Sequence, residues 1–465
     1  MIELMMTLDS HSGRHLYEQI YDYMKSEIRK GHLLFGERLP STRFLAEYLQ
    51  VSRSTVDLAY GQLLSEGYIE SRPYKGFFVC QMEELYDLQN TMEQTTADGE
   101  EEPMQFRYDF SPNVVELSSF PFGTWKKITK ETLIDDRKEL FALGHPQGDG
   151  ELRTTICHYL HTSRGVNCTP EQIVIGAGND YLLLLLEKIL GRERKIALEN
   201  PTYKRAYRIF QSFAWQVGTV PMDTYGMCVD ALYESGADLA YVMPSHQFPT
   251  GIVMPIGRRL ELLKWAAGEP GRYLIEDDYD SEFRYRGKPI PSLQASDQAD
   301  QVIYIGTFSK AIAPAIRISY MVLPRRLLER YREQCLFFSS TVSRIDQSIL
   351  NVFIRDGAFE RHLNKMRKIY KSRHDVLLSS CRSLLKRVTI SGENGGLHLI
   401  LHYHGEQTEK ELIRRAAEKG IRVYGMADSH IGRLPDDWQP TLILGYAGLC
   451  EDEIETGIRL LSDCI

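Results

Sequence analysis

An acidic stretch at residues 81–106 divides this chain into two parts of different character. Its eight acidic residues are Glu83, Glu84, Asp87, Glu93, Asp98, Glu100, Glu101 and Glu102, and it contains no Lys or Arg. Such a polar segment buries too little apolar surface to offset the conformational entropy lost on folding, so we predict a flexible linker. The position of this linker in the chain of 465 residues therefore predicts a small domain over residues 11–80 and a large domain over residues 107–465.

Residues 11–80 have the pattern of a compact helical unit that ends in a β-hairpin. Apolar residues recur at helical spacing over 16–28, and Ser41 and Ser52 each stand where an N-cap belongs, ahead of a further helical run. Short apolar strands flank a turn at 73–76. This order predicts a winged helix-turn-helix, mainly α with a β-wing. The periodicity is also compatible with an ordinary helical subdomain whose helices begin at serine caps.

In a helix-turn-helix the start of the third helix enters the major groove of double-stranded DNA. The candidate DNA-binding residues are Arg43, Ser52, Arg53, Ser54, Thr55 and Lys75. Arg53 has the reach to pair with a guanine edge, whereas the others suit phosphate. Residues 1–80 contain nine Lys and Arg against ten Asp and Glu, a net charge of −1. The cations must therefore gather on one face, or a dimer must present two such faces.

The composition is typical of a soluble intracellular protein. Hydrophobic residues make up 43% and charged residues 25%, and the first ten residues lack the basic start and apolar run of a secretory signal. The most apolar stretch, 181–186, is too short to span a bilayer. The eight cysteines form no CxxC pair, so we expect neither a metal site nor a disulfide framework. We expect a cytoplasmic protein without a membrane partner.

From residue 107 onwards, short apolar runs alternate with segments long enough for helices. The runs lie at residues 173–175, 196–198, 239–243, 273–275, 302–305 and 318–323. This rhythm predicts an α/β domain with a mostly parallel central sheet that helices cover on both faces.

Polar residues follow several of these runs in an order that suits pyridoxal 5′-phosphate (PLP). That cofactor needs a lysine amine, a carboxylate for its pyridine nitrogen, a donor to its phenolate oxygen, and hydroxyls, backbone amides and an arginine for its phosphate. The matching residues are Lys310, Asp277, Tyr279, Thr307, Ser309, Arg317, Gly178 and Asn179. Singly, each has an ordinary explanation as a surface lysine, a cap or a nucleotide-binding turn. Their joint order predicts PLP as the cofactor.

Motifs in the first part resemble a known family of regulators. They read Leu39-Pro40-Ser41-Thr42-Arg43-Phe44-Leu45-Ala46, Val51-Ser52-Arg53-Ser54-Thr55-Val56 and Leu64-Ser65-Glu66-Gly67-Tyr68. Over nearly all of residues 11–80 the chain closely resembles the winged helix of GntR-type regulators.

Motifs in the second part resemble fold-type I aminotransferases. They read His145-Pro146-Gln147-Gly148, Asn200-Pro201-Thr202-Tyr203, Pro244-Ser245-His246-Gln247-Phe248-Pro249-Thr250-Gly251, Glu276-Asp277-Asp278-Tyr279-Asp280-Ser281-Glu282-Phe283, Thr307-Phe308-Ser309-Lys310 and Arg317-Ile318-Ser319-Tyr320. The whole chain resembles the MocR subfamily of GntR regulators, which joins both domains. Within it the likeness is strongest to regulators that respond to γ-aminobutyrate (GABA).

The resemblance implies a role for each matching residue. Lys310 would form the internal aldimine, Asp277 would pair with the pyridine nitrogen, and Tyr279 would bond the phenolate oxygen. Further cofactor-binding residues would be Tyr203 stacked on the ring, Ser309 and Arg317 at the phosphate, and Thr307, Gly178, Asn179 and His246. Arg205 would lie beside the effector. A homodimer is also implied, in which the DNA-binding heads could exchange between subunits.

One position departs from the GABA-responsive pattern. Where that pattern has an arginine that binds the ligand carboxylate, this chain has Asp428. An aspartate at this place would repel a carboxylate. This substitution argues against GABA as the effector, unless Arg205 or Arg433 binds the carboxylate or Asp428 points to solvent.

Together these observations predict a PLP-dependent, DNA-binding transcriptional regulator that senses an amino acid or related amine through aldimine exchange at Lys310. Its aminotransferase-like domain would serve as a sensor and not as an enzyme. One alternative is an active aminotransferase with a DNA-binding head, which would convert amino and keto acids steadily. The other is a sensor of PLP itself that controls vitamin B6 synthesis, in which PLP alone would change DNA binding. The sequence leaves the effector, the operator and the direction of regulation open.

Overall fold

The computed structural model describes residues 6–9, 13–81, 106–134, 137–285, 287 and 290–465. The predicted linker at 81–106 lies, apart from its two end residues, outside these described residues. The chain divides into two compact units, 1–104 and 105–465, and each is described by itself.

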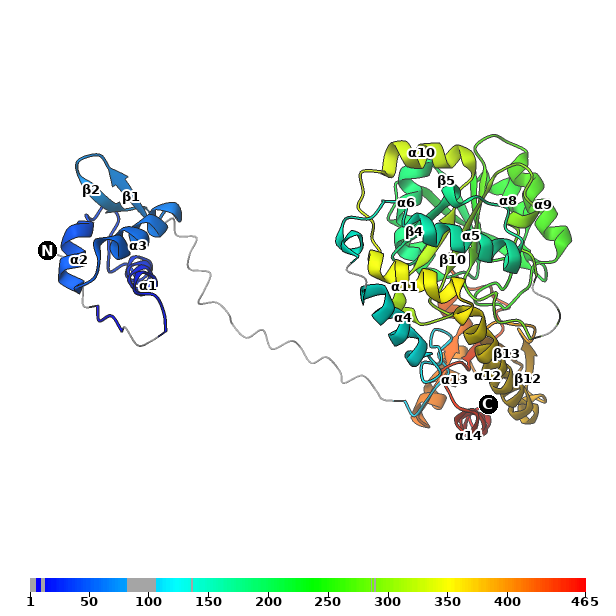
Figure 1. Cartoon of the computed structure of the whole chain (residues 1–465). Helices are drawn as coiled ribbons and strands as arrows, with labels where there is room; N and C mark the ends of the chain where they lie inside the picture. Colours follow the sequence, from blue (N-terminus) through cyan, green and yellow to red (C-terminus); the bar gives the residue numbers. More distant parts are fainter. Residues whose placement is uncertain (1–5, 10–12, 82–105, 135–136, 286, 288–289) are drawn as a thin grey trace. The chain divides into compact units, whose positions relative to one another are not determined.

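The first unit is a three-helix domain followed by an antiparallel hairpin (Figure 1). Its elements are α1 (Leu16–Arg29), α2 (Thr42–Leu49), α3 (Arg53–Ser65), β1 (Ile69–Arg72) and β2 (Gly76–Val79). Both predicted caps form, since Ser41 Oγ accepts from Phe44 N and Ser52 Oγ accepts from Thr55 N, each at 3.2 Å. The helices pack their apolar faces into one core. The winged helix-turn-helix is therefore confirmed.

An eight-stranded sheet forms the centre of the second unit, in the order β4-β11-β10-β9-β8-β5-β6-β7. The strands are β4 (Ile173–Gly176), β5 (Lys195–Asn200), β6 (Gln216–Asp223), β7 (Gly226–Met227), β8 (Leu239–Val242), β9 (Tyr273–Asp278), β10 (Val302–Thr307) and β11 (Ser319–Val322). β11 runs antiparallel to β4 and β10, and β7 runs antiparallel to β6. The mostly parallel sheet is confirmed, and all six apolar runs form strands. β6 was not predicted, because it lies near one edge, is partly exposed and has no apolar run.

Helices cover both faces of this sheet (Figure 1). They are α5 (Gly150–Arg164), α6 (Asn179–Leu190), α7 (Lys204–Gln211), α8 (Val229–Ser235), α9 (Ile256–Ala267), α10 (Arg325–Cys335), α11 (Arg344–Arg355) and α12 (Ala358–Ser380). In β4, Val174 packs with α6, α7 and α10, whereas Ile173 and Ile175 pack with α5, α11 and α12. The opposite faces of a pleated strand thus enter different cores, which fixes the register.

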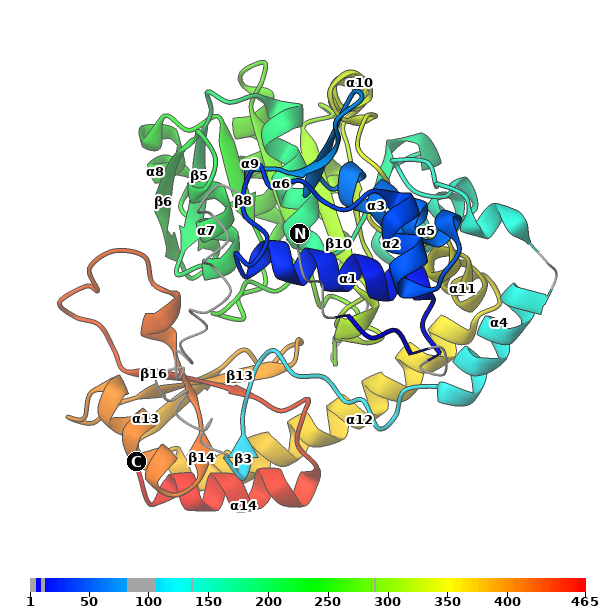
Figure 2. The same ribbon diagram turned by 90° about the vertical axis from the view of Figure 1, so that its left-hand side faces the viewer.

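The C-terminal residues form a second layer in which the start of the unit takes part (Figure 2). Its elements are β3 (Tyr108–Asp109), β12 (Val388–Ser391), β13 (His398–Tyr403), α13 (Glu409–Glu418), β14 (Ile421–Arg422), β15 (Tyr424–Gly425), β16 (Thr441–Gly445) and α14 (Glu451–Ser462). Helix α4 (Phe122–Ile134) packs instead on α11. β3 pairs with β14, so residues just after the linker are bound to residues more than 300 positions later. Among the described residues, no helix combines the length and apolar composition needed to cross a membrane.

Candidate cofactor and effector site

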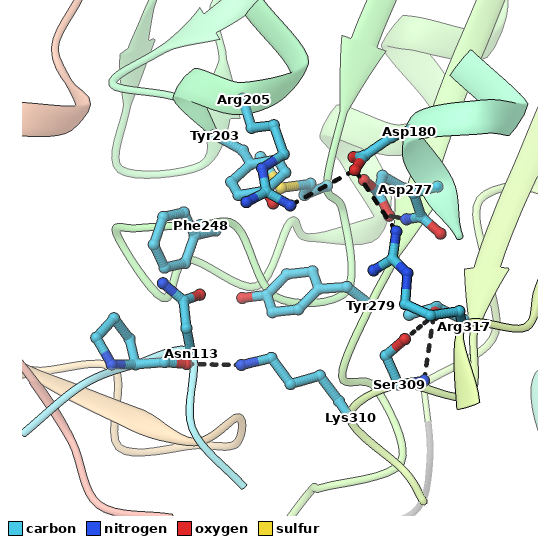
Figure 3. A pocket seen from close by; sticks show the side chains of 14 residues that line it. Asn113, Asp180, Tyr203, Arg205, Phe248, Asp277, Tyr279, Ser309, Lys310 and Arg317 are labelled. Carbon is cyan, nitrogen blue, oxygen red and sulfur yellow. Dashed lines mark hydrogen bonds and ion pairs between the residues drawn. The ribbon is translucent and has the colours of Figure 1, made fainter. Parts of the chain in front are cut away.

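A cavity opens where the parallel strands of the central sheet reach their carboxyl ends (Figure 3). Its lining residues are Pro112, Asn113, Asn179, Asp180, Tyr203, Arg205, Met243, Phe248, Asp277, Tyr279, Thr307, Ser309, Lys310 and Arg317. The ends of parallel strands meet at one edge of a sheet, and ligands of open α/β sheets bind there. The predicted cofactor residues line this cavity, except Gly178 and His246.

Lys310 extends into the cavity from the loop after β10 (Figure 3). Its Nζ donates to the carbonyl oxygen of Pro112 at 2.6 Å. Burial lowers the pKa of the Lys310 amine from 10.5 to about 8, and the nearby Asp280 carboxylate opposes this shift. A buried lysine with a lowered pKa is a nucleophile that is partly neutral near pH 7.

We expect this amine to capture PLP quickly at neutral pH. Only a neutral amine attacks an aldehyde, and a pKa of about 8 leaves roughly a tenth of Lys310 neutral at pH 7, against about 1 in 3000 for a pKa near 10.5. In stopped-flow absorbance, the capture rate of the apoprotein should rise with pH and level off above about pH 8. A rate that still rises steeply near pH 10, as expected of Nα-acetyl-lysine in the same buffers, would contradict the lowered pKa of Lys310.

Asp277 ends deep in the cavity with its carboxylate held by two neutral donors. The Tyr241 hydroxyl donates to Oδ2, and Asn179 Nδ2 donates to Oδ1 at 3.2 Å. Burial raises the pKa of Asp277 to about 7, while the Tyr241 and Asn179 donors oppose the shift. Among the described residues, no Lys or Arg forms an ion pair with Asp277. A buried carboxylate without a cationic partner fits a protonated pyridine nitrogen, which would supply the missing charge.

Tyr279 stands between the cavity and a buried histidine–aspartate pair. His246 Nδ1 lies 3.1 Å from the Tyr279 hydroxyl and 2.9 Å from Asp280 Oδ2. When the Nδ1 proton is shared with Asp280, the Tyr279 proton is free to point into the cavity. Burial also raises the pKa of Tyr279 well above its usual value, which keeps the hydroxyl protonated. Tyr279 thus suits a donor to a phenolate oxygen, and His246 orients it from behind.

The turn between β4 and α6 is the segment for which the sequence predicts an anion cradle. Gly178 has φ +89°, and a Cβ there would lie 2.3 Å from Arg317 Nη2. Arg317 therefore occupies space that only a glycine leaves open. Ser309 N donates to Thr307 Oγ1 at 3.2 Å, so the β10 loop brings its hydroxyls to the same place. Backbone amides, hydroxyls and an arginine at a helix start fit a phosphate group.

An unpredicted carboxylate shares this region with two arginines. Asp180 Oδ2 lies 3.6 Å from Arg317 Nη2 and 3.5 Å from Arg205 Nη1 (Figure 3). Arg205 belongs to α7, which begins directly after Tyr203, and its side chain is 61% exposed. The ring of Tyr203 packs edge-on against Phe248, with 5.9 Å between centroids. Arg205 is therefore an accessible cation beside an aromatic wall, which suits a carboxylate-bearing ligand.

The other two predicted effector residues do not line the cavity. Arg433 is 86% exposed and pairs with Asp436 at 2.7 Å. Asp428 is exposed on the short 3₁₀ turn Met426–Ser429. Asp428 is therefore accessible to solvent and lies outside the lining of the cavity.

Several residues that line the cavity were not predicted from the sequence. Pro112 and Asn113 come from the segment after β3, about 200 positions before Lys310, and no local pattern marks them. Phe248 stands within a quoted motif and was not assigned a role. Tyr241 does not line the cavity but donates to Asp277 from within a predicted strand, and the alternation of buried side chains along β8 directs it there.

The predicted DNA-binding residues lie on the surface of the first unit. Arg43, Ser52, Arg53, Ser54 and Lys75 are exposed, and Thr55 is half-buried. Ser52 Oγ lies 2.8 Å from Ser54 Oγ and 2.7 Å from Thr55 Oγ1. Arg53 forms an exposed ion pair with Asp57 at 3.6 Å, a weak contact that DNA phosphate can replace. Tyr74, fully exposed with φ +62° in the hairpin turn, was not predicted.

Both halves of the chain match family models. Residues 16–79 match the bacterial regulatory proteins of the gntR family, and residues 111–456 match aminotransferase class I and II. In structure, the chain is similar to a multiple substrate aminotransferase from Thermococcus profundus, with a TM-score of 0.69 and 26% identity. That likeness covers 78% of this chain and 92% of the aminotransferase.

Curated relatives match over nearly the full length. The HTH-type transcriptional regulator YdeL of Bacillus subtilis is 42% identical over 96% of both chains. The probable rhizopine catabolism regulatory protein MocR of Rhizobium meliloti is 31% identical over 98% of this chain and 95% of its own. The HTH-type pyridoxine biosynthesis transcriptional regulator PdxR of Corynebacterium glutamicum is 28% identical over 100% of this chain and 99% of its own.

The resemblance to regulators that respond to GABA stays a prediction.

The helix-turn-helix carries the DNA-binding function, and the aminotransferase-like domain is of the type that binds PLP. The chain belongs to the MocR/PdxR-type transcriptional regulators, in which a GntR helix-turn-helix is joined to an aminotransferase class I and II domain.

Proposed function

We propose that this chain is a PLP-dependent transcriptional regulator that senses an amino acid or related amine at Lys310. The observation that carries the proposal is the position of the half-buried Lys310 amine in one cavity with Asp277, Tyr279 and Arg317, and with the exposed cation of Arg205. When bound, PLP supplies an aldehyde carbon for which the lysine and an effector amine can compete.

The side chains of this cavity divide into two roles. Asp277 would hold the pyridine nitrogen protonated, Tyr279 would donate to the phenolate oxygen, and Arg317 with the Gly178 turn would bind phosphate. The second role belongs to Arg205, which would bind the effector carboxylate once Asp180 is displaced from it. An amine without a carboxylate would lack this contact, so amino acids are favoured over simple amines.

An effector changes DNA binding only if it favours one arrangement of the DNA-binding units over another. We propose that the chain forms a homodimer, and that the effector changes the arrangement of its two DNA-binding units. Large apolar side chains with 44–90% exposure recur between residues 114 and 143, next to the cavity residues Pro112 and Asn113. They are Val114, Leu117, Phe122, Leu133, Ile134, Phe141 and Leu143. Exposed apolar side chains of this size mark an interface. Residues 81–106 are long enough to let the heads exchange between subunits.

The test uses the PLP-loaded full chain, DNA from the region upstream of its own gene, and a panel of GABA, both alanine enantiomers and other amino acids. We expect the same amino acids to shift the visible absorbance and to change the affinity for DNA measured by fluorescence anisotropy. Arg53→Ala should weaken DNA binding about tenfold or more in every state, whereas Arg14→Ala, an equal charge change ahead of α1, should not. Amino acids that shift the absorbance without changing DNA affinity would contradict the proposed sensing.

A second candidate function rests on the relative named for pyridoxine biosynthesis, which matches over the whole chain. In that case PLP added to apoprotein would change DNA affinity, and the amino acid panel would change it no further. Steady production of keto acid by the pure protein would instead favour an active aminotransferase.

A further inference from the structure

Two buried thiols and an exposed imidazole meet at the end of α5, outside the cavity. Cys168 Sγ lies 3.9 Å from Cys157 Sγ, and Cys157 Sγ lies 3.7 Å from His161 Nε2. The three ligand atoms all lie within 4.8 Å of one another. None of these residues lines the cofactor cavity, and the proposed function gives them no role.

The local fold explains why these residues meet although the sequence contains no CxxC motif. Cys157 and His161 are four positions apart on α5 and so share one face of the helix. Gly165, with φ +67°, caps α5 and turns the chain back. Val166 N then donates to Leu160 O at 3.3 Å, and Cys168 returns against Cys157. The absence of a CxxC motif led us to expect no metal site. The turn at Gly165 nevertheless brings Cys168 as close to Cys157 as the two cysteines of a CxxC motif would be.

The distances fit a tetrahedral cation. Bonds of about 2.3 Å to sulfur and about 2.05 Å to nitrogen place tetrahedral ligand atoms roughly 3.8 Å apart for two sulfurs and about 3.6 Å apart for sulfur and nitrogen. The two separations that involve Cys157 Sγ are 3.9 Å to Cys168 Sγ and 3.7 Å to His161 Nε2, and Cys168 Sγ lies within 4.8 Å of the imidazole ligand atom. We propose that Cys157, His161 and Cys168 bind one thiophilic divalent cation, with Zn²⁺ as its probe, and that water completes the tetrahedron.

The charge of the filled site and its access to solvent also support a bound divalent cation. Two thiolates neutralise Zn²⁺, so the filled site adds no net charge to a place where both sulfurs are buried. Binding releases the two thiol protons to solvent, to which the exposed His161 gives access. His161 Nε2 lies 2.8 Å from the Cys168 carbonyl oxygen, to which it can donate a proton. Metal binding breaks this hydrogen bond, because it needs the Nε2 lone pair and therefore the tautomer with its proton on Nδ1. The cation would fasten the end of α5 to the segment that enters β4.

The experiment uses the untagged, PLP-loaded full chain, reduced, freed of metal with a chelator and desalted. One zinc per chain is expected after one equivalent of Zn²⁺ and desalting, with competition against a chromogenic chelator giving the affinity. Cys168→Ser should weaken zinc binding on the order of a hundredfold. His161→Gln should weaken it by about tenfold or more, whereas His158→Gln, an exposed histidine on the same helix, should leave it unchanged.

A second readout guards against a cysteine variant that fails to fold. With Co²⁺ in place of Zn²⁺, the unmodified chain should show the visible bands of tetrahedral cobalt and the charge-transfer band of thiolate ligation. Equal zinc binding by the His161→Gln and His158→Gln variants would overturn the proposal. So would a chain that takes up no cobalt and instead loses two hydrogens in air by forming a Cys157–Cys168 disulfide.

Discussion

Lys310→Ala should abolish the response to every amino acid while leaving DNA binding itself intact. The variant keeps the phosphate and ring contacts but loses the only lining amine of the described cavity that can join the PLP aldehyde. PLP affinity is expected to fall by on the order of a hundredfold, because a covalent bond is lost. Absorbance titration with PLP measures the affinity, and anisotropy with DNA measures the response.

The matched control is Lys264→Ala, which removes an exposed lysine from the last turn of α9. It should leave PLP affinity, absorbance and response as they are. If the Lys310→Ala chain, saturated with PLP, still changes its DNA affinity on addition of an amino acid, then sensing does not pass through Lys310. The effector would in that case bind by its carboxylate alone.

Two glycines at the ends of α6 allow two effects of a substitution to be separated: backbone strain, and loss of the space that Arg317 occupies beside the phosphate site. Gly178 caps the start with φ +89° and Gly191 caps the end with φ +94°. A Cβ at position 191 meets nothing within 4 Å, whereas a Cβ at 178 lies 2.3 Å from Arg317 Nη2. We expect Gly178→Ala and Gly191→Ala to lose similar stability, about 1–3 kcal/mol each. Only Gly178→Ala should also displace Arg317 and weaken PLP binding, by roughly tenfold or more.

Thermal unfolding by circular dichroism gives the stability of both variants, and absorbance titration gives their PLP affinity. An equal loss of affinity in both chains would mean that strain in α6, and not the space kept for Arg317, controls the site. Unchanged affinity in both would remove the Gly178 turn from the phosphate site.

The site residues that follow the strands could be predicted, because the order and direction of the strands in the sheet are enough to bring the carboxyl ends together. Lys310, Asp277 and Asn179 come from three separate runs, yet parallel strands bring such ends to one edge, and there they line the cavity. The serine caps of the first unit were equally predictable, because the cap and its partner are three residues apart.

What could not be predicted depends on contacts between distant residues. Pro112 reaches Lys310 only because β3 joins the C-terminal layer, and nothing near residue 112 encodes that pairing. The Cys157–Cys168 contact depends on the left-handed turn at Gly165. Whether Asp428 faces the cavity or solvent depends on how its 3₁₀ turn packs, which a single aligned position does not reveal.

The hydrogen bond from Lys310 Nζ to the Pro112 carbonyl connects the amine to the segment at the start of the second unit. Pro112 lies three residues beyond β3, and β3 is the first strand after the linker. β3 itself stays in place through its pairing with β14 and through the burial of Phe110. A ligand that draws the lysine amine away would therefore free the Pro112 carbonyl without detaching the strand, so the segment directly after Phe110 is the part of the unit that can respond to the state of the amine.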